Sequence, residues 1–281
     1  MENITRHRSH EIAHIALAAS LAAIALTGCN SRGGNTTPKA ESSAVPSATS
    51  TKTSSAVPTP SAVPKRTTTH DNPTISLQRS LNAVLTPYGM PALTLDGNAG
   101  GQTKRALCAE RIFSGHAASR AEATVADRNQ LKSHEKLSSK LPGFVISRTC
   151  QVMGINIGDR LSMIIPISTG APAGYFQDSP QDHTTAAGNF HIGQGIYGLH
   201  NSTKYPSKHS AGNMLFSGFF NGDEAVHGSP EMSDAVTSPI SHGCVRFDVK
   251  YAPHIWELMG GQKIGVQDHY VNLSPIPVEV L

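Results

Sequence analysis

The chain has 281 residues, enough for one large domain or two of modest size. Charged residues make up 15% of it, aromatic residues 5%, and the formal net charge is only +3. With so small a charge and no basic stripe carrying interleaved aromatic residues, we expect no nucleic-acid partner.

The first 28 residues have the features of an export signal. A positive start is followed by the apolar stretch 15–26, which is too short for a comfortable membrane span. The stretch ends in Leu-Thr-Gly-Cys29, which resembles a bacterial lipobox. The resemblance implies that Cys29 is lipidated and anchors the protein to the bacterial cell membrane, outside the cytoplasm and facing the cell wall. The alternative is an ordinary signal peptide, 1–28, that happens to be followed by a cysteine.

Residues 29–70 predict a linker. The sequence Ser-Ala-Val-Pro occurs three times in this segment, with serine and threonine between the copies. Such a composition has too few large apolar residues to form a core, and its prolines favour extended conformations. We expect a disordered tether that acts as a spacer.

Residues 71–116 predict a small helical domain. Leu77, Leu81 and Leu85 follow helical spacing, and a second helix is expected over 103–112. The pattern is similar to that of the peptidoglycan-binding domain, a three-helix bundle, although Gly101 stands where that family often has proline. The alternative is a structural helical cap. Residues 117–140 predict a connector with one helix, over 121–137.

From Phe144 onward the pattern changes to short runs rich in β-branched residues. Asp248 is expected to cap a helix that ends at Gly260, followed by a last strand at 264–266 and a tail at 271–281. The predicted strands are 144–147, 150–157, 160–168, 189–192, 214–220 and 224–227. The predicted fold is therefore a mainly β domain, 141–270, preceded by a small α-helical bundle.

One segment of the β domain combines a thiol with an imidazole. His227 precedes Cys244 by 17 positions, which fits two neighbouring strands joined by a loop. A free cysteine has a pKa of about 8.5, so a nearby base is needed to make it a good nucleophile at neutral pH. The adjacent Gly243 leaves room for a substrate carbonyl and for backbone N–H groups that stabilise an oxyanion.

The motif His227-Gly228, a gap, and Ser241-His242-Gly243-Cys244-Val-Arg246 resembles the signature of the YkuD-type L,D-transpeptidases. The resemblance implies a β-sandwich-like catalytic domain that acts on peptidoglycan stem peptides through a cysteine thioacyl-enzyme and forms 3→3 cross-links. It also implies that His227 is the base, that the Gly228 carbonyl orients its ring, and that carbapenem-type β-lactams acylate Cys244. No cofactor is implied.

Several roles stay open at this point. His242 is a second candidate for the base, because it lies two residues before the thiol on an extended segment. Arg246 is expected either to bind a substrate carboxylate or to hold the loop through backbone carbonyls, and Ser241 either to contact substrate or to support the loop. The other histidines are expected at the surface or in loops.

Other functions remain alternatives to the transpeptidase. The same site could act as an L,D-carboxypeptidase or another hydrolase, and the chain could be a non-catalytic wall-binding lipoprotein. Cys244 could be an inert buried thiol. A zinc site is not expected, because the sequence has neither Cys-x-x-Cys nor His-Glu-x-x-His.

The remaining cysteines, Cys108 and Cys150, are candidates for a disulfide in an exported protein. The bridge would tie the middle of the chain to the start of the β domain. The alternative is two separately buried thiols.

Overall fold

The computed structural model describes residues 72–133, 135–139, 141–208 and 210–281. The predicted signal peptide, Cys29 and the predicted linker lie outside these residues, as does His209. No helix among the described residues is long and apolar enough to cross a membrane.

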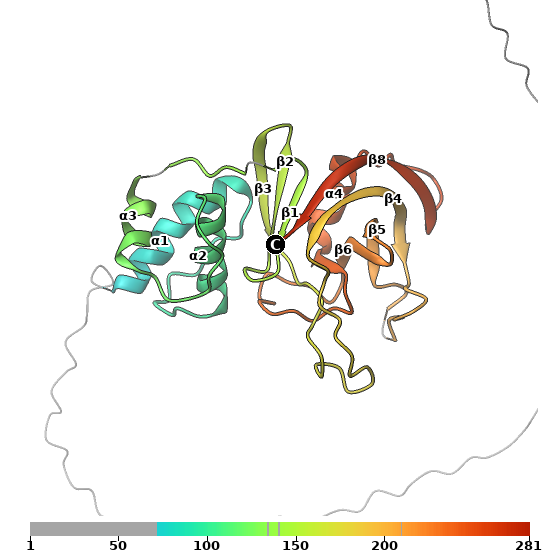
Figure 1. The fold of residues 1–281 in the computed structure, drawn as a ribbon, viewed down its shortest axis with the longest axis horizontal. Helices are drawn as coiled ribbons and strands as arrows, with labels where there is room; N and C mark the ends of the chain where they lie inside the picture. The colour runs from blue at the N-terminus through green and yellow to red at the C-terminus, as the bar shows by residue number, and fades with distance from the viewer. Residues whose placement is uncertain (1–71, 134, 140, 209) are drawn as a thin grey trace, which may run out of the picture. The chain divides into compact units, whose positions relative to one another are not determined.

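The described chain begins with a helical unit (Figure 1). Asn72 caps the first helix, since its side-chain oxygen accepts a hydrogen bond from the Thr74 amide at 2.8 Å, and a proline follows at the first helical position. The elements are α1 (Pro73–Leu85), the 3₁₀ helix η1 (Thr86–Tyr88), α2 (Gly101–Phe113) and α3 (Val125–Ser133).

The third helix of this unit comes from the segment that was expected to be a connector. Leu131 and Leu137 are buried in the same cluster as the leucines of α1 and α2. Arg111 of α2 donates two hydrogen bonds to Asp127 of α3, at 2.8 and 2.7 Å, and holds the pKa of that carboxyl well below its usual range. The helical unit therefore continues to Leu137 instead of ending at 116, and α3 is shorter than the predicted helix.

The helical unit shares its core with the first strands of the β domain. Val145, Val152 and Ile164 belong to the same buried cluster as the helices. Cys108 and Cys150 are joined by a disulfide, with their Cα atoms 5.3 Å apart. Packing at this contact is tight, because a Cβ at Gly154 would lie 2.4 Å from the Phe113 ring. The two parts therefore form one packed body.

Eight strands form a single sheet in the order β3-β2-β1-β8-β4-β5-β6-β7. The segment after β3 returns to the opposite edge, where Ser168 bridges to Arg246 of β7. The mainly β fold preceded by helices is thus confirmed. The strands are β1 (Phe144–Ser147), β2 (Val152–Ile157), β3 (Arg160–Pro166), β4 (Gly188–His200), β5 (Met214–Asn221), β6 (Glu224–Ser229), β7 (Val245–Asp248) and β8 (His269–Val280).

The last strand differs from the sequence expectation. Residues 271–281 were expected to be a tail, but β8 lies in the middle of the sheet, parallel to β1 and antiparallel to β4. The expected strand at 264–266 is a loop. Pro275 and Pro277 cannot donate a backbone hydrogen bond, and both precede Val278, where pairing with β1 begins. The prolines are tolerated because β8 has only one neighbour at their positions.

A short helix follows the predicted nucleophile. Asp248 accepts a hydrogen bond from the Lys250 amide and caps the 3₁₀ helix η2 (Val249–Tyr251), which leads into α4 (Ala252–Leu258). Gly260, with φ of +74°, ends this segment in the left-handed region. Trp256 of this helix is buried in the core of the β domain.

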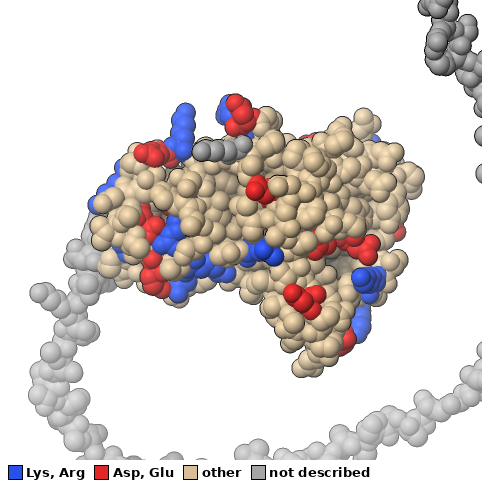
Figure 2. All heavy atoms as spheres, viewed as in Figure 1, with Lys and Arg blue, Asp and Glu red and all other residues tan. Residues whose placement is uncertain are grey.

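The surface is not dominated by one sign of charge. On the face drawn in Figure 2, basic and acidic side chains are interspersed over the helical unit, and the β domain is mostly uncharged. This agrees with the small net charge of +3.

Candidate active site

The Ser241–Cys244 loop is held by its own hydrogen bonds and by those of its neighbours. The Ser241 hydroxyl donates to the Cys244 carbonyl and accepts from the Gly243 amide. The Gly243 carbonyl accepts from the Thr185 hydroxyl at 2.7 Å. Gly243 has φ of +120°, a conformation that favours glycine. These contacts fix the backbone that presents the thiol.

Parallel pairing of β6 with β7 brings His227 and Cys244, the predicted base and nucleophile, to one cavity. His227 pairs with Arg246, and Cys244 directly precedes β7. All three residues line one cavity. His227 is only 2% exposed. Its Nδ1 lies 3.0 Å from the Gly228 carbonyl, the contact expected from the sequence. If Nδ1 carries the hydrogen and donates it there, Nε2 is free to accept a proton.

Both reacting groups are uncharged at neutral pH. Burial lowers the pKa of His227 from 6.5 to about 3, against the opposing effect of the Gly228 carbonyl. Burial also raises the pKa of the Cys244 thiol, although the Ala225 amide partly offsets the effect. The thiol lies 3.7 Å from the Asp223 carbonyl. The cavity is therefore lined by a neutral thiol and a neutral imidazole.

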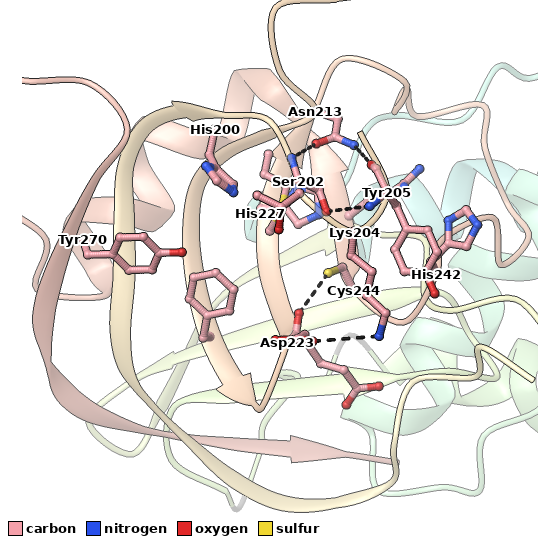
Figure 3. Close-up of a pocket in the computed structure, with 15 residues that line it drawn as sticks. His200, Ser202, Lys204, Tyr205, Asn213, Asp223, His227, His242, Cys244 and Tyr270 are labelled. Atoms are coloured by element: carbon pink, nitrogen blue, oxygen red, sulfur yellow. Dashed lines mark hydrogen bonds and ion pairs between the residues drawn. The ribbon is translucent and has the colours of Figure 1, made fainter. Parts of the chain in front are cut away.

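Cys244 and His227 open into a cavity of about 240 Å³ (Figure 3). Aromatic side chains supply part of its wall, and Lys204 and Asp223 form a wide ion pair of 3.9 Å at its edge. The described residues contain no group of three His, Cys, Asp or Glu side chains that could hold a metal ion. The cavity thus combines a nucleophile, a base and polar groups that could orient a peptide.

His242 is clamped between two aromatic rings. Its ring stacks on Phe176 at 3.7 Å and on Tyr205 at 4.0 Å, so it joins the loop after β3 to the loop after β4. Burial lowers its pKa, and nearby His183 lowers it further. With both ring faces covered, His242 fits a structural role better than that of the base.

Two residues expected to contact substrate behave differently. Ser241 is completely buried, and its hydroxyl bonds within the loop, which favours loop support, one of its two expected roles, over contact with substrate. Arg246 lines the cavity, and its Nη1 donates to the Glu231 carboxylate at 2.7 Å. Arg246 thus holds a side chain of the preceding loop, where backbone carbonyls had been the expected partners, and it also faces the substrate cavity.

Several residues that line the cavity or lie near it carry no motif in the sequence. Asn213 organises the 201–213 loop, accepting from the Ser202 amide at 3.0 Å and donating to the Tyr205 carbonyl at 2.7 Å. His200 lines the cavity, and His183 is buried against Ser179, with 2.7 Å between Nε2 and Oγ. No local motif marks these positions, because the loop carries only ordinary turn residues.

Residues 144–271 match the family model of the L,D-transpeptidase catalytic domain, YkuD. No curated protein matches the chain. An L,D-transpeptidase structure from Xylanimonas cellulosilytica is 24% identical, with 74% of this chain and 92% of that chain covered and a TM-score of 0.45.

Two further solved structures are more distant. One is an L,D-transpeptidase from Stackebrandtia nassauensis, 16% identical, with 74% of this chain and 90% of that chain covered and a TM-score of 0.38. The other is LdtMt1 in complex with imipenem, 18% identical, with 49% of this chain and 57% of that chain covered and a TM-score of 0.35. The family assignment depends on the model match and the motif within it: residues 144–271 belong to the YkuD family of L,D-transpeptidase catalytic domains.

Proposed function

We propose that this protein is a peptidoglycan L,D-transpeptidase with Cys244 as its nucleophile. The observation that carries the proposal is the placement of His227 on β6 and of Cys244 directly before the neighbouring parallel strand β7, with both residues lining one cavity within a YkuD domain. Stem peptides of peptidoglycan are the substrates, and the first product is a thioacyl-enzyme.

In the first half-reaction, Cys244 Sγ attacks the carbonyl that joins the third, diamino-acid residue of a tetrapeptide stem to its terminal D-Ala. His227 Nε2 takes the thiol proton as the C–S bond forms. The C–N bond then breaks, and His227 gives the proton to the leaving D-Ala amine. The Gly243 amide is engaged by Ser241, which leaves the Cys244 amide as the backbone donor for the oxyanion.

In the second half-reaction, the side-chain amine of another stem attacks the thioester carbonyl. His227 accepts a proton from this amine and returns it to the departing sulfur, which restores the neutral pair. The product is a 3→3 cross-link. Water in place of the amine would give an L,D-carboxypeptidase, so exclusion of water from the cavity decides between the two products.

The proposed location follows from the sequence. Cys29 anchors the chain by its lipid to the outer face of the cell membrane, and the following segment tethers the enzyme within reach of the wall. Glycan binding by the helical unit stays a prediction.

Imipenem labelling tests the nucleophile. Intact-mass spectrometry of the chain incubated with imipenem should show one adduct, because the thiol attacks the β-lactam carbonyl as it would attack a stem. Cys244→Ala should show none. An unlabelled native protein, under conditions that label a known L,D-transpeptidase, would contradict the proposal.

A further inference from the structure

The connection between the base and the nucleophile crosses the sheet. Because β6 and β7 are parallel, the chain leaving Ser229 must return to the other end of the sheet before Val245. Residues 230–240, here called the strap, make up most of this crossover. Any displacement of the strap therefore acts on the segment that sets the position of Cys244 relative to His227.

Side chains of the helical unit donate hydrogen bonds to the middle of the strap. Arg105, at 2% exposure, donates from Nη1 to the Val236 carbonyl at 2.6 Å and from Nη2 to the Asp234 carbonyl. Gln102 also donates to the Asp234 carbonyl, at 3.1 Å. Burial lowers the pKa of Arg105 to about 10, so its guanidinium remains charged at neutral pH. The buried guanidinium of Arg105 thus donates hydrogen bonds to two carbonyls of the strap.

A second arginine and a glycine extend this contact. Arg120 donates to the Thr237 carbonyl at 2.5 Å and to the Gly101 carbonyl at 3.1 Å, so it joins the strap to the start of α2. A Cβ at Gly101 would lie 2.5 Å from the Thr237 hydroxyl, closer than atoms approach without a shift. This packing gives a physical reason for glycine at the position where the peptidoglycan-binding pattern often has proline.

The other side of the strap holds the catalytic loop. Glu231 accepts from Arg246 at 2.7 Å, and Arg246 follows Cys244 by two residues. The Ser238 carbonyl accepts from Ser168 at 2.8 Å, close to the Ser168–Arg246 bridge. The strap is therefore held by the helical unit on one side and by the nucleophile strand on the other.

We infer that Arg105 and Arg120 are positioning residues, through which the helical unit fixes the strap and so sets the catalytic geometry of Cys244 and His227. The inference builds on the proposed function and extends it: the helical unit is part of the catalytic apparatus. Arg105 and Arg120 act through the strap carbonyls and do not touch the reacting atoms.

Single-turnover acylation by imipenem tests this inference on the soluble chain from residue 72. Arg105→Lys keeps the charge but loses the forked pair of donors. The saturating acylation rate constant should fall about tenfold or more, since small displacements of reacting groups are costly. The half-saturating concentration and the fully labelled fraction should remain those of the native chain. A variant that merely misfolds in part would lower the labelled fraction and leave the rate constant unchanged.

A second variant keeps the test decisive if Arg105→Lys does not fold. Gly101→Ala favours the helix but pushes Thr237 away, so it should also lower the rate constant. Adding Thr237→Ala removes the clashing hydroxyl and should restore most of the rate. Lys104→Ala is the matched control, because Lys104 lies on the same helix and pairs with Glu122.

Native rate constants in folded Arg105→Lys and Gly101→Ala would overturn the inference. So would a slow Gly101→Ala variant that Thr237→Ala does not rescue. Absence of labelling in the native chain itself would instead contradict the proposed function, so the two failures are distinguishable.

Discussion

At the scale of single residues, the reactive pair is set by burial. His227 is enclosed on β6, and its Nδ1 is occupied by the carbonyl of the next residue. This arrangement keeps the ring neutral and oriented, and it raises the energy of a resting thiolate–imidazolium pair. The proposed mechanism therefore transfers the thiol proton during attack and does not require a preformed thiolate.

The first prediction concerns pH. An ordinary histidine of pKa 6.5 would be about 30-fold less deprotonated at pH 5 than at pH 8. Because the pKa of His227 is lowered to about 3 and that of Cys244 is raised, the acylation rate constant should change less than about twofold over this range. Stopped-flow measurement with imipenem at pH 5, 6, 7 and 8 provides the profile.

The lowered pKa of His227 also makes the folded state less stable at acid pH. The unfolded chain binds a proton at His227 below pH 6.5, whereas the folded chain resists it down to about pH 3. This contribution of His227 to the free energy of unfolding is complete above pH 6.5 and is lost as the pH falls toward 3.

For the rate prediction, an acylation rate constant that drops steeply between pH 7 and pH 5, with the protein still folded, would contradict the presence of a neutral thiol and a neutral imidazole.

The second prediction concerns Ser241. Its hydroxyl bonds the Cys244 carbonyl and the Gly243 amide, so Ser241→Ala leaves buried polar groups without that partner. We expect a loss of about 1–3 kcal/mol in the free energy of unfolding, together with slower acylation. Urea unfolding and imipenem labelling measure the two effects. Ser76→Ala, at an exposed position on α1, should change neither, and equal behaviour of both variants would refute the assigned role.

The sequence predicted the residues of the site better than their surroundings. The motif predicted that His227, Gly228 and Cys244 lie together, because it combines rare residue types at short spacing, and the structure places them at one site. The stacking of Phe176 and Tyr205 on His242 could not be predicted, because these two residues come from separate loops that meet only in the folded protein. The sequence left the role of Ser241 open for the same reason, since its burial depends on neighbouring loops.

At the scale of elements, the helical unit and the β1–β3 strands form one packed layer. One set of side chains from β1–β3 belongs to the same buried cluster as the helices, and the Cys108–Cys150 disulfide lies within it. Local patterns predicted α1, α2 and the β2–β3 hairpin well. They missed the extent of the helical unit, since Leu137 reaches the core from a polar segment. They also missed β8, because a segment with two prolines has a weak strand pattern.

The third prediction concerns the disulfide. It closes a loop with a sequence separation of 42, so its removal should cost about 4 kcal/mol by the chain-entropy relation. Comparison of the Cys108→Ala/Cys150→Ala double variant with the native chain in urea measures this difference. The double variant keeps the Cys244 thiol, so the folded variant should still be labelled by imipenem. Unfolding curves that coincide would show that the bridge does not stabilise the joint core.

At the scale of the whole molecule, the proposed anchor and enzyme should be separable. The fourth prediction is that Cys29→Ala moves the protein from the membrane fraction to the soluble exported fraction, because the lipid is its only proposed anchor. Immunoblots of fractionated cells test this, with Cys244→Ala as the control that stays in the membrane fraction. Unchanged fractionation of Cys29→Ala would refute the lipoprotein assignment.

The most direct test of the central claim uses the stem substrate itself. The soluble chain from residue 72, incubated with purified disaccharide-tetrapeptide, should yield a dimer lacking one D-Ala, detected by mass spectrometry. Cys244→Ala should yield none. Loss of D-Ala without dimer would identify a hydrolase in place of the transpeptidase, and a dimer formed equally by Cys244→Ala would contradict the cysteine mechanism.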